Sequence, residues 1–467
     1  MDAKQLTRLR TDLAAFLDEI MPDRLGNVTR RRWAEVYLRG LLLDGQRKSV
    51  EPMAQRLRAT DGSARDYAQA LQQFLNQSPW EDRPVRDRLA RRVVATVGTG
   101  GFVIVDDTGF PKQGTHSVGV ARQYSGTLGK VGNCQVAVTL QYATEQEVFA
   151  LDAELYLPEE WGSDRDRLDD AGVPRDIGYR PKWQIALALL ERAKANGING
   201  PVLADSAYGD ATAFRQALDE GRWRYCVGIS STLKVVAADH DFGRAPPYRG
   251  TGRRPSRPEK VRAGAAAPSV KEWAQARAGD FRRVTWREGS KGKLSSRFAA
   301  WRVRPAHRLS AGQEPLAACW LVVEWPEGEA EPTKYFFSNL AVGTSLLRLV
   351  RTAKGRWWVE QTNKDLKEVW GAGQQQLRNV SANVGAFNLN GWLHTVVEAW
   401  AWERPEDELV DRSQSPWDDA TRRPSHADKR KALQREVLRQ EIEAVVAGPP
   451  DRQRFRELAE KLLELAA

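Results

Sequence analysis

Two short apolar runs that end in aspartate constrain this chain more than any other feature of its 467 residues. Residues 102–105 (Phe-Val-Ile-Val) lead into Asp106 and Asp107, and residues 202–204 (Val-Leu-Ala) lead into Asp205. Apolar runs of this length are typical of buried strands, and a carboxylate at the end of such a strand is costly to bury unless a cation neutralises it. The two runs therefore predict strand ends where acidic oxygens meet a cation.

The pattern around these runs predicts a mixed sheet flanked by helices. Strand-like segments at 92–97, 102–106, 135–142 and 148–157 come first, and helices at 183–195 and 212–218 then alternate with the strand at 202–204. Between 220 and 340 the strand-like pieces become short and aromatic, which indicates a β-rich insertion. The resulting domains are a helical, DNA-binding region at 1–90, the core at 91–219, the insertion at 220–340, the rest of the core at 341–402, and a linker with a C-terminal helical segment at 403–467.

A third acid lies in a strongly helical segment. Glu360 shares its spacing with Arg356, Lys364 and Lys367, which recur at steps of three and four residues and so project from one helix face. One acid among three bases fits a metal-binding carboxylate beside phosphate contacts, although an exposed face with salt bridges gives the same pattern. Three carboxylates can bind two hard divalent cations, which support in-line phosphoryl transfer. An isolated strand-end aspartate can equally be a turn or a helix cap.

The charge balance favours a polyanionic partner. Lys and Arg number 71 and Asp and Glu 61, which gives a net charge of +10. Basic side chains gather at Arg30, Arg31 and Arg32 in the N-terminal helices, and at Arg253 and Arg254 in the Pro-, Gly- and Arg-rich loop 244–262. Both segments are candidate DNA contacts; the alternatives are a solvated helical cap and a solvated loop.

The cysteines and histidines predict neither a disulfide framework nor a structural zinc site. The three cysteines lie far apart, no Cys-x-x-Cys occurs, and the five histidines are scattered along the chain. This usage fits a reducing cytoplasm. The longest apolar runs fall far short of the roughly 20 residues that a membrane span needs, and the N-terminus shows no apolar signal core.

Several of these segments together resemble a known family. Arg356, Glu360 and Lys367 fit the pattern Arg-x3-Glu-x6-Lys, and residues 204–208 (Ala-Asp-Ser-Ala-Tyr) fit a Gly/Ala-Asp-x-x-Tyr/Phe box. With residues 106–114, 119–135 and 155–161, they resemble bacterial insertion-sequence transposases of the DDE type with the YREK signature. This is the IS-four group, and the likeness to its IS seven-zero-one relatives covers roughly residues 35–400.

The resemblance implies a ribonuclease-H-like core with a β insertion before the last acid. It implies metal-dependent cleavage at transposon ends followed by strand transfer, in a cut-and-paste reaction that related enzymes carry out through hairpin ends. Two Mg²⁺ ions, which Mn²⁺ can replace, would be bound by the first acid (Asp106 or Asp107), by Asp205 and by Glu360. The implied partners are double-stranded DNA, as terminal inverted repeats and target, and a second copy of the chain on that DNA, at the nucleoid in the cytoplasm.

Further roles follow from the basic residues themselves and from the resemblance. Arg356, Lys364, Lys367, Lys112 and Arg122 would contact phosphates near the cut. An insertion-domain tryptophan would hold a flipped base by stacking. The candidates for this role are Trp286, Trp301, Trp320 and Trp325.

The chain departs from the family pattern in one place and leaves the first acid open. Ala353 occupies the position of the signature tyrosine. The pattern Asp-x-Thr selects Asp106 as the first acid, whereas the acid directly before Thr108 is Asp107. Adjacent strand residues face opposite ways, so only one can be a ligand. A transposase-derived DNA-binding protein without cleavage activity and a metal-dependent nuclease that does not join strands are the alternative functions.

Overall fold

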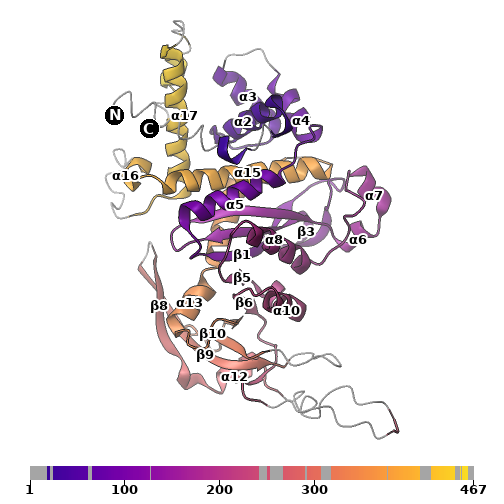
Figure 1. Ribbon diagram of the computed structural model, residues 1–467, viewed down its shortest axis with the longest axis vertical. Coiled ribbons are helices and arrows are strands. Elements are labelled where there is room, and N and C mark those ends of the chain that lie inside the picture. Colours follow the sequence, from indigo (N-terminus) through magenta and orange to yellow (C-terminus); the bar gives the residue numbers. More distant parts are fainter. Residues whose placement is uncertain are drawn as a thin grey trace. The chain divides into compact units, whose positions relative to one another are not determined.

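The computed structural model describes residues 18–21, 25–61, 66–126, 128–240, 250–252, 267–289, 292–306, 317–375, 377–410, 422–447, 453 and 455–460. The chain divides into two compact units, whose helices and strands are labelled in Figure 1. The first unit comprises Met1–Gly100, Asp107–Ile198 and Trp358–Ala467, and the second comprises Gly101–Asp106 and Asn199–Trp357. Strand β1 is therefore divided between the two units: residues 102–106 belong to the second unit, and residues 107–111 belong to the first.

The strands of the first unit are built around the long strand β3. Strands β2 and β4 both pair antiparallel with β3, β2 along residues 130–134 and β4 along residues 136–143. Strand β1 is also a hydrogen-bonded neighbour of β3. The bounds are β1 Phe102–Pro111, β2 Ala121–Ser125, β3 Lys130–Ala143 and β4 Val148–Tyr156.

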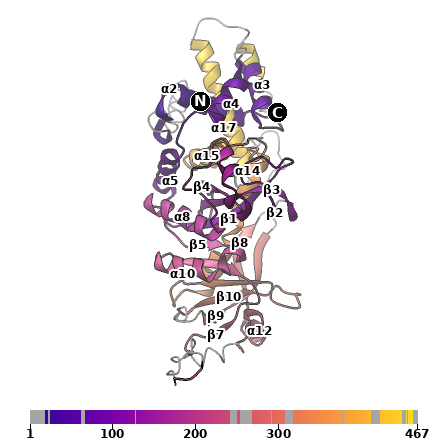
Figure 2. The same cartoon turned by 90° about the vertical axis from the view of Figure 1, so that its right-hand side faces the viewer.

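The second unit continues from β1 through parallel and then antiparallel strands. Strand β5 pairs parallel with β1 and with β6, and β11, β10, β9 and β7 follow in antiparallel order, with β8 on β9. Figure 2 shows β7, β9 and β10 together with helix α12 beside them. The bounds are β5 Val202–Ala204, α9 Ser206–Gly209, α10 Thr212–Glu220, β6 Tyr225–Ile229, β7 Val235–Ala237, α12 Val270–Gln275, η3 Ala278–Asp280, β8 Arg282–Gly289, β9 Gly292–Pro305, β10 Cys319–Glu324, β11 Lys334–Ser338 and α13 Leu346–Lys354.

Through β1, the hydrogen-bonded order of the core strands is β4-β3-β1-β5-β6. Parallel and antiparallel pairs occur in the same sheet, and helices accompany the strands in both units. The predicted mixed sheet flanked by helices is confirmed. Its physical basis is the run at 102–105, all four residues of which are buried in β1, as an apolar strand between two neighbours requires.

Helix α15 is the central helix of the first unit. It has 23 residues, most of them buried, and packs on β4 and on helices α4, α5 and α17. Figure 1 shows α5 and α15 side by side. Neither α15 nor another helix in the described parts of the chain is long and apolar enough to cross a bilayer. The bounds are α2 Val28–Leu42, α3 Val50–Asp61, α4 Tyr67–Asn76, α5 Arg83–Val97, α6 Glu159–Gly162, α7 Arg165–Asp170, α8 Lys182–Ala195, α14 Trp357–Glu368, α15 Val380–Trp402, α16 Glu406–Leu409 and α17 His426–Ala447.

The prediction of a strand at 92–97 is wrong, because these residues form the end of helix α5. Val85, Leu89 and Val93 are buried at four-residue steps, so the apolar stripe has the period of a helix once the preceding residues are included. Gly98 caps the helix with a φ of 75°, a backbone conformation that favours glycine. Burial of one helix face outweighs the β-preference of two adjacent valines.

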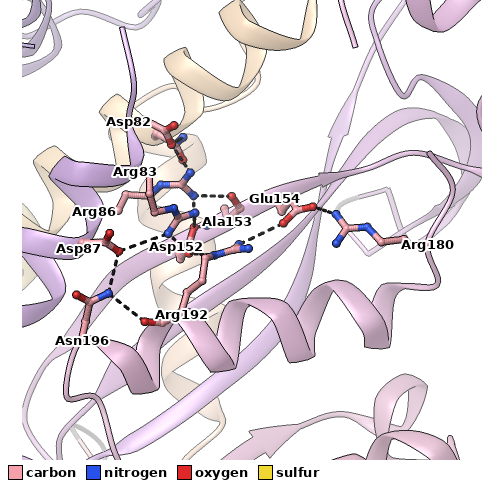
Figure 3. A network of polar contacts seen from close by, with 11 residues as sticks. Asp82, Arg83, Arg86, Asp87, Asp152, Ala153, Glu154, Arg180, Arg192 and Asn196 are labelled. Carbon is pink, nitrogen blue, oxygen red and sulfur yellow. Dashed lines mark hydrogen bonds and ion pairs between the residues drawn. The ribbon is translucent and has the colours of Figure 1, made fainter. Parts of the chain in front are cut away.

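A buried ionic network fixes α5 and α8 to β4 (Figure 3). The Asp152 carboxylate of β4 accepts from Arg83 at 2.9 Å, from Arg192 of α8 at 3.1 Å, and from Arg86. Burial by itself raises the pKa of Asp152, but the three guanidinium groups outweigh it and hold the pKa below its ordinary value. The Asp152 carboxylate is therefore a charged anchor for two helices.

Candidate active site

Asp106 and Asp205 lie at the ends of adjacent parallel strands in the second unit. The register pairs Val103 with Val202 and Ile104 with Leu203, and its continuation sets Asp106 opposite Asp205. Asp106 follows the buried part of β1 and is itself buried, with 8% of its surface exposed. The two predicted strand-end acids are therefore neighbours.

Asp205 is held by the turn into α9. It is the N-cap of that helix, and its Oδ1 accepts from the Ala207 amide at 3.0 Å. Two glycines let this turn lie against β6: a Cβ on Gly209 would be 1.9 Å from the Gly228 carbonyl oxygen. The close approach fixes one oxygen of Asp205 in the cap and leaves the other for a second contact.

Arg356 joins the two acids. Its Nη2 lies 3.0 Å from Asp106 Oδ1 and 3.8 Å from Asp205 Oδ2. The residue before it, Gly355, ends helix α13, and a Cβ there would come within 3.1 Å of Leu203. Glycine therefore allows the turn between α13 and α14 to sit on the strands and deliver the guanidinium to their ends.

The donor set at these strand ends fits a hard divalent cation. Two carboxylates share a single guanidinium, so the group of three carries a net charge of −1. Carboxylate oxygens are the ligands that Mg²⁺ prefers. The guanidinium offsets one of the two negative charges, and the carboxylate oxygens of Asp106 and Asp205 are of the kind that could hold a metal ion.

Asp107 has a different partner. Its Oδ2 lies 2.5 Å from the Lys182 ammonium at the start of α8, in the first unit. This agrees with the alternation of a strand, in which neighbouring side chains leave opposite faces. Asp106 and Asp107 therefore meet separate cations.

Glu360 lies in the first turn of α14 and is exposed. It follows Arg356 by four residues along the chain, and Arg356 itself immediately precedes the helix. Lys364 is also exposed and pairs with Glu368 at 3.8 Å. The Lys367 ammonium lies 5.8 Å from the centre of the Phe110 ring. Glu360 and Lys364 thus occupy solvent-facing positions of this helix.

The other predicted phosphate contacts differ in how the fold uses them. Arg122 is exposed on β2, whereas the Lys112 ammonium donates to the Gly373 and Gln375 carbonyls at 3.1 and 2.8 Å. Burial lowers the pKa of Lys112 to about 8. Lys112 therefore ties β1 to the segment after α14 in this structure.

The three arginines at 30–32 in the N-terminal helices differ in their contacts. Arg30 donates to the Leu25 carbonyl at 3.4 Å, and Arg31 pairs with Glu35 at 2.9 Å and with Asp18. Arg32 is exposed. Arg253 and Arg254 lie outside the described residues.

The four candidate tryptophans are all half-buried in the second unit. The indole N–H groups of Trp301, Trp320 and Trp325 donate to Asp280, the Ala341 carbonyl and the Glu329 carbonyl at 2.7, 3.2 and 2.9 Å. Trp286 packs edge-on against Phe298 with ring centres 5.6 Å apart. All four side chains therefore have contacts within the second unit, three of them on strands and Trp325 directly after β10.

Trp357 is a further candidate for stacking on a base, beyond the four tryptophans predicted from the sequence. This side chain is 43% exposed at the start of α14, next to Arg356, and the Arg287 guanidinium lies 4.3 Å from its ring centre. An exposed indole beside an arginine suits stacking on a nucleic-acid base. The available signal was the position of the Trp-Trp pair directly after Arg356.

Comparison with known proteins identifies the family of the chain. The family model described as DDE superfamily endonuclease matches residues 21–293, more than half of the chain. The chain belongs to this family. The matched range contains Asp106, Asp107 and Asp205 and ends before Glu360.

Two individual proteins are similar to this family member. A probable transposase for insertion sequence element IS701 from Microchaete diplosiphon is 34% identical over 206 residues, or 43% of this chain and 50% of that protein. The chain thus matches about half the length of this curated relative. The cryo-EM structure of the piggyBac transposase synaptic complex with hairpin DNA aligns over 99% of this chain and 82% of that chain, with a TM-score of 0.38 and 9% identity. A similarity at this level does not define a shared fold.

Proposed function

We propose that this family member is an active DNA transposase of the insertion-sequence type, which cleaves DNA at the ends of its element and joins those ends to a target. The observation that carries the proposal is the pair Asp106 and Asp205, at adjacent parallel strand ends and bridged by Arg356. Family membership and the likeness to an insertion-sequence transposase support the same reaction class.

Asp106, Asp205 and Glu360 are the proposed ligands of two Mg²⁺ ions, with Mn²⁺ as a substitute. Bound ions of this kind lower the pKa of an attacking water or 3′-hydroxyl and offset charge on the leaving oxygen. The separate pairing of Asp107 with Lys182 supports Asp106 as the first acid. Ala353 offers no hydroxyl where the YREK signature has tyrosine, so the proposed signature reduces to Arg356, Glu360 and Lys367.

The side chains around the acids serve binding and charge balance. Arg356 bridges the two aspartates and orients them, and its guanidinium is suited to a phosphate oxygen. Exposed Lys364, Arg122 and Arg32 are further proposed contacts to the DNA backbone. Such contacts set affinity and register and leave sequence choice to other groups.

The proposed substrates and assembly follow from this reaction. The chain would bind the inverted repeats at the two ends of its element as double-stranded DNA, and then the target duplex. Two ends require two active sites, so we propose a homodimer on DNA. A DNA substrate also places the working enzyme at the nucleoid in the cytoplasm.

The decisive experiment compares neighbouring acids. The substrate is a duplex carrying the inverted repeats that flank the gene in its native DNA, with Mg²⁺ or Mn²⁺ added. We expect Asp106→Asn, Asp205→Asn and Glu360→Gln each to lower cleavage by about 100-fold or more while DNA binding persists. The matched control, Asp107→Asn, should stay within a few-fold of the unchanged chain, because it removes a partly exposed ion pair with Lys182 and leaves the contacts of Arg356 with Asp106 and Asp205 in place.

Other outcomes identify a different function. Cleavage lost in Asp107→Asn and kept in Asp106→Asn would reassign the first acid. If the unchanged chain binds the repeats in EDTA and cuts them at no metal concentration, it is a DNA-binding protein and not an enzyme. Failure to join pre-cut ends, with cleavage intact, would make it a nuclease.

A further inference from the structure

A second group of metal-ligating side chains lies inside the first unit. Asp365 of α14, His394 of α15 and His426 of α17 are all buried, and one ligand atom from each lies within 4.8 Å of the others. Figure 2 labels the three helices that supply them. His394 follows Asp365 by 29 residues, and His426 follows His394 by 32 residues, so the sequence contains no short spacing motif that would predict the group.

The most telling member is His394. It is fully buried, and neither of its ring nitrogens has a hydrogen-bond partner. A neutral imidazole carries one N–H donor and one acceptor, so leaving both unsatisfied in the interior costs free energy. The His394 ring instead stacks on His426, with centres 4.4 Å apart and planes 13° from parallel. Buried polar groups without partners call for an explanation, and a bound cation supplies one.

His426 has the surroundings of a metal ligand. Its Nδ1 donates to Glu398 Oε1 at 2.5 Å, and the other oxygen of Glu398 accepts from Lys429 at 2.7 Å. A carboxylate on one ring nitrogen fixes the tautomer and leaves the lone pair on the other nitrogen, as in many zinc sites. That lone pair on Nε2 now accepts from the Trp370 indole at 3.0 Å.

We propose that Asp365, His394 and His426 bind one transition-metal ion, most suitably Zn²⁺, which links helices α14, α15 and α17. Two imidazole nitrogens and one carboxylate suit Zn²⁺, whereas Mg²⁺ prefers an all-oxygen set. The second oxygen of Asp365 or one water completes four ligands. The role is structural: the ion would fix α17 and α14, the helix that carries Glu360, to the central helix.

The charge states of the ligands agree with this assignment. Burial, helped by the positive charges of Lys429 and Arg430, lowers the pKa of His426 to about 3. Burial also lowers the pKa of His394 far below its ordinary value. Both rings are therefore neutral near pH 7, the state that ligates metals. Burial raises the pKa of Asp365 to about 6, so its carboxylate is mostly ionised at that pH.

Closing the site onto an ion requires small movements. Zinc–ligand bonds of about 2.0–2.2 Å put tetrahedral ligand atoms about 3.3 Å apart, so the present atoms, all within 4.8 Å of one another, need to move by at most about 1 Å each. The hydrogen bond from the Trp370 indole to His426 Nε2 must also break, because the metal ion would take the same lone pair. Trp370→Phe removes this competition and should leave zinc affinity unchanged or raise it by up to about tenfold.

The test uses the full chain, stripped with a chelator and dialysed. With ZnCl₂ added, we expect about one zinc per chain by elemental analysis and a rise in Tm of several degrees at saturation. Co²⁺ should give the visible absorption of a tetrahedral site. Asp205→Asn should keep this zinc, which separates the site from the proposed catalytic metals.

Two matched variants decide the matter. His394→Leu removes an unpartnered buried polar group, so it should fold at least as well without metal, yet lose the bound zinc and the Tm rise. His116→Leu, at an exposed histidine, should keep both. Zinc content and Tm rise retained in His394→Leu, or no zinc bound by the unchanged chain, would overturn the proposal.

Discussion

The ionic network around Asp152 gives a prediction whose magnitude can be worked out from the structure. Replacing Asp152 by Asn keeps the size of the side chain and removes a charge that faces Arg83, Arg86 and Arg192. Breaking a buried ion pair by removing one partner typically costs 3–5 kcal/mol. Each arginine here keeps a second carboxylate, in Asp87, Asp82 or Glu154. We therefore expect a loss of about 2–4 kcal/mol in unfolding free energy at pH 7.

The dependence on pH follows from the depressed pKa of Asp152. A carboxyl whose pKa is lower in the folded state stabilises the fold above its unfolded pKa of about 3.9, and this stability is lost as the pH falls towards the folded pKa. The difference between the unchanged chain and Asp152→Asn should thus be full at pH 7 and shrink below about pH 4.

The assay is urea unfolding followed by circular dichroism, with amide hydrogen exchange of peptides from α5, β4 and α8 as the local measurement. Exchange in these elements should accelerate in Asp152→Asn. The control is Asp169→Asn, which removes an exposed ion pair with Arg165 and should leave the urea midpoint unchanged. Coincident unfolding curves for Asp152→Asn and the unchanged chain at pH 7 would refute the reasoning.

Two further predictions concern DNA. Trp357→Ala should reduce cleavage of the element-end duplex at least tenfold without moving the urea midpoint, since this indole is 43% exposed; an equal loss in Trp325→Ala, whose N–H is bonded within the fold, would argue against a special role for Trp357. Arg32→Glu should weaken duplex binding at low salt and reduce the slope of log affinity against log salt by about one, as measured by fluorescence anisotropy. An unchanged slope would remove Arg32 from the interface.

Local patterns predicted most of the core strands. The runs at 102–105 and 202–204 are apolar on both faces, and this composition is compatible with little besides a buried strand. The segment 92–97 shows the limit of this reasoning. Three valines and a threonine indicate a strand in a short window, while the burial of Val85, Leu89 and Val93 on one face of α5 depends on what packs against that face.

The candidate acids were predictable as residues but not as contacts. Asp106, Asp107 and Asp205 could be recognised because each follows an apolar run. Which of the first two meets Arg356 depends on the orientation of β1, and on a turn at Gly355 that lies about 250 residues further along the chain. Likewise, Trp357 becomes a candidate only when its exposure is known.

By itself, the sequence determined the buried strands, the acids at their ends and the excess of positive charge, because these depend on neighbouring residues and on composition. The tertiary structure alone decided which cation each acid meets. It also brought together His394 and His426, two of five scattered histidines, with rings 4.4 Å apart. Contacts of this kind join segments that are far apart in the chain and share no regular spacing. Only the packing of whole helices against one another brings their side chains into contact.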